Sequence, residues 1–280
     1  MHFTPTRGQV LAEDAYHPTD LTTSLGDYTK RQEALQKGIP SILSISSARA
    51  GSSSIANQLS AFSGCPRVGV DAQPTPIEHD VAFGMLQDFV RGGVVSYVHS
   101  RASKKNIDAL NDANLLKFIL HVRDPRQSLL SNYFSMHAMG AGDWGYLRVY
   151  YNNIPLNYEQ MSFEEHMDWH IENVYRYYWL EWIEEWYEVA MSWDNLFEIK
   201  IMTFESMKRE PLRYFKEIGD FFDLDWSHFT DDDLLPVTNN PKTEVKGRTD
   251  YWRQKLTPRQ IEKLQELTPD SLLKNFDWTR

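Results

Sequence analysis

The chain has a single cysteine, Cys65, among its 280 residues. One cysteine excludes an intramolecular disulfide and a zinc site built from several cysteines, and it fits a reducing compartment. Positive charge is also scarce, because 29 lysines and arginines stand against 39 aspartates and glutamates, a formal net charge of −10. Nonspecific nucleic-acid binding needs a surplus of cations, so we do not expect it. A small anionic ligand needs only a few local cations and stays compatible with this balance.

Long apolar runs are missing as well. No stretch reaches the roughly 18 apolar residues of a membrane span, so we predict none. The N-terminal sequence MHFTPTRGQVLAEDAYHP has no apolar core of signal-peptide length and is interrupted by acidic residues. These absences predict a cytoplasmic protein. Because the start of the chain is polar and weakly patterned, we expect an N-terminal arm over 1–38 and one domain over 39–280, long enough for a sizeable core.

Short apolar runs are present at 41–46, 93–98, 115–122 and 196–204. Each has the length and the Ile, Val, Leu or Phe content of a strand. Helical spacing follows some of them, as at Ile55, Leu59 and Phe62. Strands that alternate with helices predict a three-layer α/β fold with a central, mostly parallel sheet covered on both faces. Ligands bind at the carboxyl ends of such strands, so the polar residues after each run are the candidates.

The first run leads into SSARAGSSSIA, in which Gly51 precedes three serines and a helical pattern. The free N–H groups and the dipole of a helix start favour an anion, and Arg49 adds a forked positive charge. A nucleoside-triphosphate loop needs a lysine after this glycine and a second glycine five residues before it. Both are missing, which disfavours ATP. A serine-rich turn without a ligand is the alternative.

The third run ends in LLKFILHVRDPRQSLLSNYF. Asp124 is placed to cap a helix, and Pro125 suits the first helical position. Arg123 leaves the strand, and we expect it to converge with Ser131 on one anion. In the alternative interpretation, Arg123 simply pairs with a carboxylate.

Together these motifs resemble those of sulfotransferases that use 3′-phosphoadenosine 5′-phosphosulfate (PAPS). Arg49-Ala50-Gly51-Ser52-Ser53 is similar to the family's first motif, in the form closest to carbohydrate sulfotransferases. Arg123-Asp124-Pro125 with Ser131 resembles the second motif, R-[ND]-P followed by a serine. VKGRTDYWRQKLTPRQ resembles a KGxxxxW pattern, and TFESMKREPLRYFKEIGDFFDL resembles a YEDLxxxP passage. The resemblance covers roughly residues 40 to 265.

The resemblance implies a P-loop NTPase-like sulfotransferase fold, PAPS as co-substrate, 3′-phosphoadenosine 5′-phosphate (PAP) as product, and no metal. Ser54 stands where many cytosolic members have Trp, which leaves the adenine-stacking partner open. The implied roles are a 5′-phosphosulfate grip at Arg49, Ala50, Gly51, Ser52, Ser53 and Ser54, a 3′-phosphate grip at Arg123 and Ser131, closure by Lys246, Gly247 and Arg248, and adenine packing at Phe204.

Sulfuryl transfer also needs stabilisation of the leaving phosphate and a base for the acceptor hydroxyl. Arg49 meets the first need. His99 is the first candidate base, because it follows the second strand and precedes Arg123 by 24 positions, similar to the catalytic histidine of cytosolic members. Carbohydrate members tend to use a carboxylate soon after the first helix, which makes Glu78 the second candidate and Asp71 the third. Each of these residues also has an ordinary structural interpretation.

A Trp- and Tyr-rich segment spans roughly 144–193, with Trp179, Trp182 and Trp186 at helical spacing. We expect this stripe to pack on the sheet, and the alternative is that some rings line an acceptor pocket. The first motif and these rings favour a saccharide or glycosylated small molecule as the hydroxyl-bearing acceptor. The rival functions are a kinase with a divergent phosphate loop and a non-catalytic nucleotide- or glycan-binding module. The sequence leaves the oligomeric state open.

Overall fold

A computed structural model of the chain describes residues 24–71, 80–139, 151, 154–192, 196–226, 230, 232 and 248–279. Its sheet contains strands β1 (Ile42–Ser46), β2 (Val95–Val98), β3 (Lys117–Val122) and β4 (Glu198–Thr203). The strand order is β2-β1-β3-β4, and every pairing is parallel. Each strand lies within one of the four apolar runs, so the predicted α/β fold with a parallel sheet is confirmed.

The register of the sheet brings three strand ends together. Ile45 of β1 pairs with Val98 of β2, and Ser46 pairs with His121 of β3. The chain leaves β1 for one neighbour and later returns to its other side, which makes the end of β1 a topological switch point. The loops that follow β1, β2 and β3 therefore start side by side at one edge of the sheet.

The helices connect and flank these strands. In chain order they are α1 (Leu25–Gln36), α2 (Ser52–Ser63), α3 (Phe83–Phe89), α4 (Lys104–Asp112), α5 (Pro125–Met139), the 3₁₀-helix η1 (Tyr158–Gln160), α7 (Phe163–Asn173), the π-helix η2 (Arg176–Glu181), α8 (Trp182–Met191), α9 (Phe204–Arg209), α10 (Pro211–Phe221), α11 (Trp252–Lys255), α12 (Pro258–Leu267) and α13 (Asp270–Asn275).

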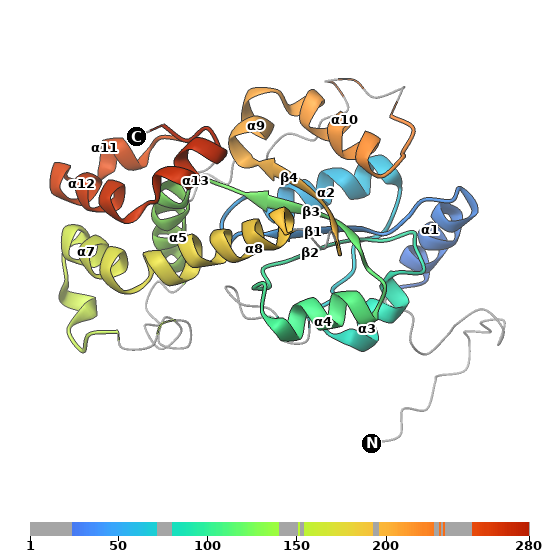
Figure 1. The fold of residues 1–280 in the computed structure, drawn as a ribbon, viewed down its shortest axis with the longest axis horizontal. Helices are drawn as coiled ribbons and strands as arrows, with labels where there is room; N and C mark the ends of the chain where they lie inside the picture. Colours follow the sequence, from blue (N-terminus) through green and yellow to red (C-terminus); the bar gives the residue numbers. More distant parts are fainter. Residues whose placement is uncertain are drawn as a thin grey trace, which may run out of the picture.

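The sheet separates two apolar cores, and this makes three layers. Helices α2 and α10 cover one face, where Ile42 and Ile119 of the sheet pack with Ile55 and Phe215. The core on the other face takes side chains from α3, α4, α5, α7, η2, α8 and α11 to α13. In Figure 1, α2, α9 and α10 lie above the sheet, while α3 and α4 lie below it. Strands β1 and β3 are central, which explains why nearly all of their residues are buried, without alternation between the two faces.

The predicted N-terminal arm is described only from residue 24 onward. Within it, α1 begins after Ser24, whose side chain accepts a hydrogen bond from the Asp27 N–H. Its Arg31 is buried and pairs with Asp88 of α3 at 2.6 Å. The division between arm and domain stays a prediction. Within the described residues, every helix is too short or too polar to cross a bilayer.

Candidate functional site

The loop after β1 ends in a helix start that presents free donors. Gly51 caps α2 in the left-handed conformation, with φ of 89°, and no side chain caps the helix. In the described part of the chain, the backbone N–H groups of Ser52 and Ser53 have no hydrogen-bond acceptor. Helix starts of this kind bind anions through these groups and through the helix dipole. The loop therefore has the helix-start geometry that its sequence indicates, and anion binding at this cradle stays a prediction.

Arg49 adds charge to this loop and holds an unusual backbone conformation. Its φ is 67°, a left-handed value that costs a non-glycine residue roughly 1–2 kcal/mol. Its side chain stays exposed, although surrounding protein desolvates the guanidinium and lowers its pKa. Arginine remains charged at neutral pH even so. Such strain in a loop is typical of a functional site.

Arg123 lies beside this loop and is almost fully buried, with 3% of its surface exposed. Its guanidinium donates to the Arg49 carbonyl at 2.8 Å and to the Arg248 carbonyl at 2.5 Å. Its Nε is buried and has no hydrogen-bond partner among the described residues. Burial lowers the pKa of Arg123 to about 10, nearby Glu205 raises it, and the neighbouring Arg49 lowers it further.

This arrangement leaves positive charge without a matching ion pair. Among the described residues, no carboxylate lies within ion-pair distance of Arg123. The alternative interpretation, in which Arg123 pairs with a carboxylate, therefore finds no support in the described part of the chain. Glu205 instead accepts the Asp124 N–H at 3.1 Å, and burial raises the pKa of Glu205. A buried N–H of a cation that lacks an acceptor lowers the stability of the folded state, and a bound anion would supply that acceptor.

Phe204, at the start of α9, connects Arg123 with the glycine of the loop. The Arg123 guanidinium lies over the Phe204 ring, 4.1 Å from its centre. A Cβ at Gly51 would lie 3.1 Å from Cε2 of the same ring. A side chain at position 51 would therefore press on the ring, which lies against both the Arg123 guanidinium and the glycine of the loop. Whether Phe204 also packs on an adenine stays a proposal.

His99 occupies the end of β2 and is half-buried. Its Nδ1 lies 2.8 Å from the Ser46 carbonyl, so Nδ1 is the protonated nitrogen of the neutral ring. The basic nitrogen is then Nε2, which suits a proton acceptor. Tyr97, two residues earlier, accepts a hydrogen bond from Ser53 of α2 at 2.9 Å. The first helical turn of the cradle and the histidine strand are thus connected.

The structure does not describe every predicted site residue. Glu78, Lys246 and Gly247 lie outside the described residues. Asp71 forms an isolated bridge with Val81. Ser131 is half-buried in α5, and no contact joins it to Arg123 in the described part of the chain.

The remaining predicted residues follow the local structure. Ala50 is buried and Ser54 lies in the first turn of α2. Asp124 caps α5 as predicted, accepting the Arg126 N–H at 2.9 Å.

Sequence reasoning missed His121, the fifth residue of β3. His121 is fully buried, its Nε2 lies 2.8 Å from the Ala50 carbonyl, and its Nδ1 lies 2.9 Å from the Tyr214 hydroxyl. Burial lowers the pKa of His121 to about 4, so the ring is neutral at physiological pH. Nε2 therefore donates to Ala50 and Nδ1 accepts from Tyr214. A histidine inside the apolar run LLKFILHV was the available signal.

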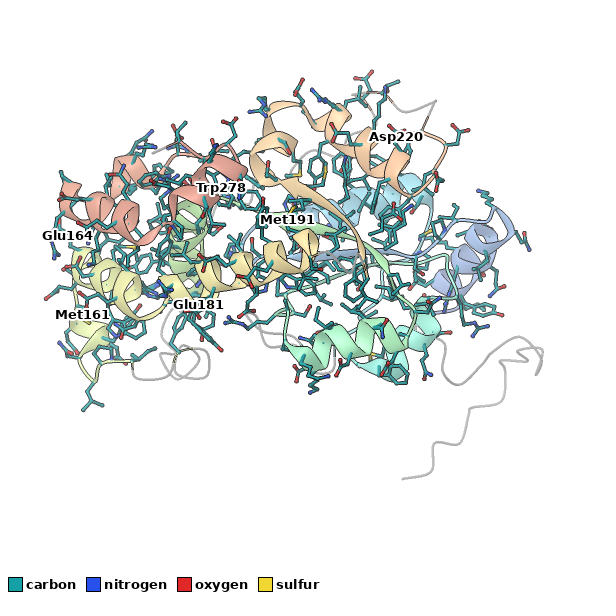
Figure 2. The ribbon with its side chains drawn as sticks, in the orientation of Figure 1. Met161, Glu164, Glu181, Met191, Asp220 and Trp278 are labelled. Atoms are coloured by element: carbon teal, nitrogen blue, oxygen red, sulfur yellow. The ribbon has the colours of Figure 1, made fainter. Side chains whose placement is uncertain are left out.

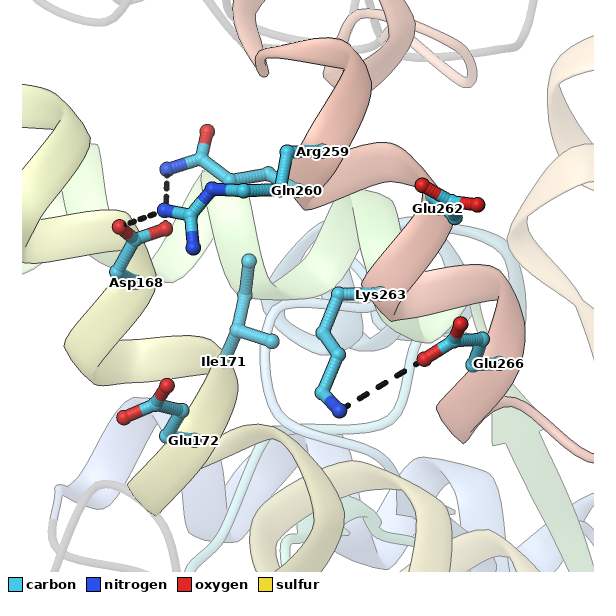
Figure 3. Close-up of a pocket in the computed structure, with 8 residues that line it drawn as sticks. All are labelled: Asp168, Ile171, Glu172, Arg259, Gln260, Glu262, Lys263 and Glu266. Carbon is cyan, nitrogen blue, oxygen red and sulfur yellow. Dashed lines mark hydrogen bonds and ion pairs between the residues drawn. The ribbon is translucent and has the colours of Figure 1, made fainter.

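A separate hollow of about 280 Å³ lies between α7 and α12 (Figure 3). Charged side chains dominate its lining, including the ion pairs Arg259–Asp168 and Lys263–Glu266. None of the predicted site residues lines it. The candidate site is therefore the strand-end cradle rather than this interhelical hollow.

Comparison with known proteins bears on this cradle. A family model for the sulfotransferase domain matches residues 107–276. No curated protein matches the sequence significantly. The mouse sulfotransferase SULT7A1, solved in complex with PAP, is 15% identical, with a TM-score of 0.53 over 85% of this chain and 88% of that one. The sulfotransferase domain from the curacin biosynthetic pathway is 11% identical, with a TM-score of 0.41 over 82% of this chain and 99% of that one.

The SULT7A1 likeness supports the fold, while the family model covers more than half of the chain and includes the Arg123 and Phe204 motifs. The chain belongs to the sulfotransferase-domain family.

Proposed function

We propose that the protein transfers a sulfuryl group from PAPS to an acceptor hydroxyl and releases PAP. The observation that carries the proposal is the buried Nε of Arg123, which has no partner in the described residues and stands beside Arg49 and the free N–H groups of α2. These donors fit an anion with two charged ends. The structure of SULT7A1 was solved with PAP, which is consistent with this ligand.

Each end of the donor has candidate residues. Arg49, Gly51, Ser52 and Ser53 bind the 5′-phosphosulfate, because they surround the start of α2. Arg123 binds the 3′-phosphate. The remaining proposed contacts of that phosphate, assigned by motif, are Ser131, Lys246, Gly247 and Arg248.

The donor supplies an activated sulfuryl group on its 5′-phosphate. The acceptor oxygen forms a bond to sulfur while the bond from sulfur to the 5′-phosphate oxygen breaks. His99 takes the acceptor's proton on Nε2, since its Nδ1–H is engaged by Ser46. Arg49 stabilises the negative charge that grows on the departing phosphate, as fixed donors do in other transfer reactions. Glu78 and Asp71 remain the alternative bases.

A saccharide is the acceptor we favour, and this finer proposal depends on the form of the first motif. Trp179, Trp182 and Trp186 are at most 2% exposed, so these rings are packed against protein and do not face a sugar. The stripe thus has the core-packing role that its spacing predicts. A screen of hydroxyl acceptors with PAPS and mass detection of an added sulfo group tests the acceptor class.

Calorimetry with PAP tests the donor site. We expect the protein to bind PAP without Mg²⁺, and Arg123→Ala to weaken binding by about tenfold or more, because it removes a charged donor worth roughly 1.5–3 kcal/mol. Arg91→Ala is the matched control, since Arg91 is exposed and pairs only with Asp88 in the described structure.

Binding of Mg·ATP but not PAP would support the kinase alternative and overturn the proposal. PAP binding without transfer to any acceptor in the screen would favour the non-catalytic module.

A further inference from the structure

The Trp-rich helix contacts two of the site loops through its indole N–H groups. Trp179 donates to the Ala48 carbonyl at 3.1 Å, next to Arg49 in the cradle loop. Trp182 and Trp186 both donate to the Ser100 carbonyl, at 2.9 Å and 2.8 Å, directly after His99. We refer to Trp179, Trp182 and Trp186 as the indole clamp. Figure 2 labels Glu181 and Met191, which mark the two ends of α8.

The spacing of the clamp explains how one helix reaches both loops. Residues three, four and seven positions apart share one helix face, and the clamp residues are separated by three and four. Trp179 lies in the π-helical segment Arg176–Glu181, just before α8 begins. Single π-helical turns inside helices are often found at functional sites.

Two indole N–H groups donate to the Ser100 carbonyl, which is more than packing of the rings alone requires. One carbonyl oxygen has two lone pairs, and here both are used by indole donors of the same helix. The next residue, Arg101, is fastened to the same helix, with its guanidinium on Glu185 at 3.1 Å and on the Tyr177 carbonyl at 3.1 Å. Residues of the consecutive elements η2 and α8 therefore hold the chain that follows His99.

We propose that the indole clamp positions the two halves of the reaction centre, setting His99 relative to the Arg49 loop; this inference rests on the function proposed above. Transfer requires the base, the acceptor oxygen and the sulfur to be aligned, and small misplacements are costly in rate. The helix donates hydrogen bonds to backbone carbonyls of both loops, and these bonds set the distance between the two loops. Trp179, Trp182 and Trp186 are positioning residues, because they act through the loops they hold.

Trp→Phe substitutions separate the indole N–H from most of the ring packing. Trp182→Phe and Trp186→Phe each leave one donor on Ser100, so we expect kcat to fall less than about threefold in either. The double variant leaves this buried carbonyl without an indole donor, and kcat should fall by about tenfold or more with PAP affinity unchanged. Trp179→Phe should instead weaken PAP binding by about tenfold, because it loosens the cradle loop.

Phe118→Leu is the packing control. Phe118 contacts the Trp186 ring edge-on at 5.7 Å but takes no part in the indole hydrogen bonds. It should lose stability while keeping kcat and PAP affinity. If the double Phe variant does not fold, 3-benzothienylalanine at positions 182 and 186 removes both N–H groups at nearly constant volume.

Additive single effects, or equal losses of kcat in the clamp variants and Phe118→Leu at matched stability, would overturn the inference. Failure of the wild-type protein to bind PAP would instead reject the proposed function, so the two failures are distinguishable.

Discussion

His99 illustrates how much of the proposed chemistry depends on one tautomer. The Ser46 carbonyl is its hydrogen-bond partner at Nδ1, and this contact assigns the basic lone pair to Nε2. The partner is supplied by the end of β1, the strand that also leads into the cradle loop. The same strand, β1, therefore positions both the candidate base and the donor site.

Replacing His99 by alanine should remove the base and leave the donor grip intact. General-base catalysis contributes about 10²–10⁴-fold, so transfer measured with labelled sulfate should fall within that range. PAP affinity, measured by calorimetry, should stay at the wild-type level. Glu78→Gln is the companion variant: full activity in His99→Ala together with a large loss in Glu78→Gln would assign the base to the carboxylate instead.

At the scale of elements, the two ends of α2 provide a matched pair of glycines. Gly51 caps the start with φ of 89° and Gly64 caps the end with φ of 70°. A Cβ at Gly64 would meet no atom within 4 Å, whereas a Cβ at Gly51 would press on the buried Phe204 ring. A side chain would strain the backbone at either glycine, whereas only at Gly51 would it also press on a neighbouring ring.

Both Gly51→Ala and Gly64→Ala should lower the free energy of unfolding by about 1 kcal/mol or more, from the left-handed conformation. Gly51→Ala should in addition weaken PAP binding, because displacing Phe204 moves the guanidinium of Arg123 that lies on it. Denaturant unfolding and PAP calorimetry measure the two effects separately. Equal PAP affinity in the two variants would contradict this role of Phe204.

At the scale of the whole molecule, acid sensitivity should arise from buried histidines. Burial lowers the pKa of His121 and His137 to about 4 and that of His170 to about 3, from an ordinary value of 6.5. His137 and His170 lie in an aromatic cluster with His166, Tyr133 and Tyr158 between α5 and α7. In the folded state these three rings resist protonation.

We expect the free energy of unfolding to fall as the pH drops from 6.5 toward 4. The folded pKa values lie below the unfolded ones, so the unfolded chain binds more protons in this window, and acid favours it. His137→Asn should flatten the slope by about one proton, which urea unfolding at several pH values measures. An unchanged slope in this variant would show that His137 does not contribute.

Much of the fold was predictable from local pattern. The four apolar runs became the four strands, Asp124 and Pro125 start α5, and the glycine-serine turn starts α2. Strand-length runs, helix caps and turn residues act through residues near them in the chain, so they can be predicted from the sequence. The sulfotransferase resemblance is confirmed by the family match, while its carbohydrate form stays a proposal.

Sequence alone thus determined the strands, the starts of α2 and α5 and the order of the motifs, because each depends on residues a few positions apart. The tertiary structure alone decided that His121 supports the cradle and that three indoles hold two loops. It also decided that the buried Nε of Arg123 meets no acceptor among the residues that the structure describes. Trp179 and Ala48 are 131 positions apart in the chain. No periodicity records which carbonyl a buried N–H will meet, since that depends on how the helix packs across the sheet.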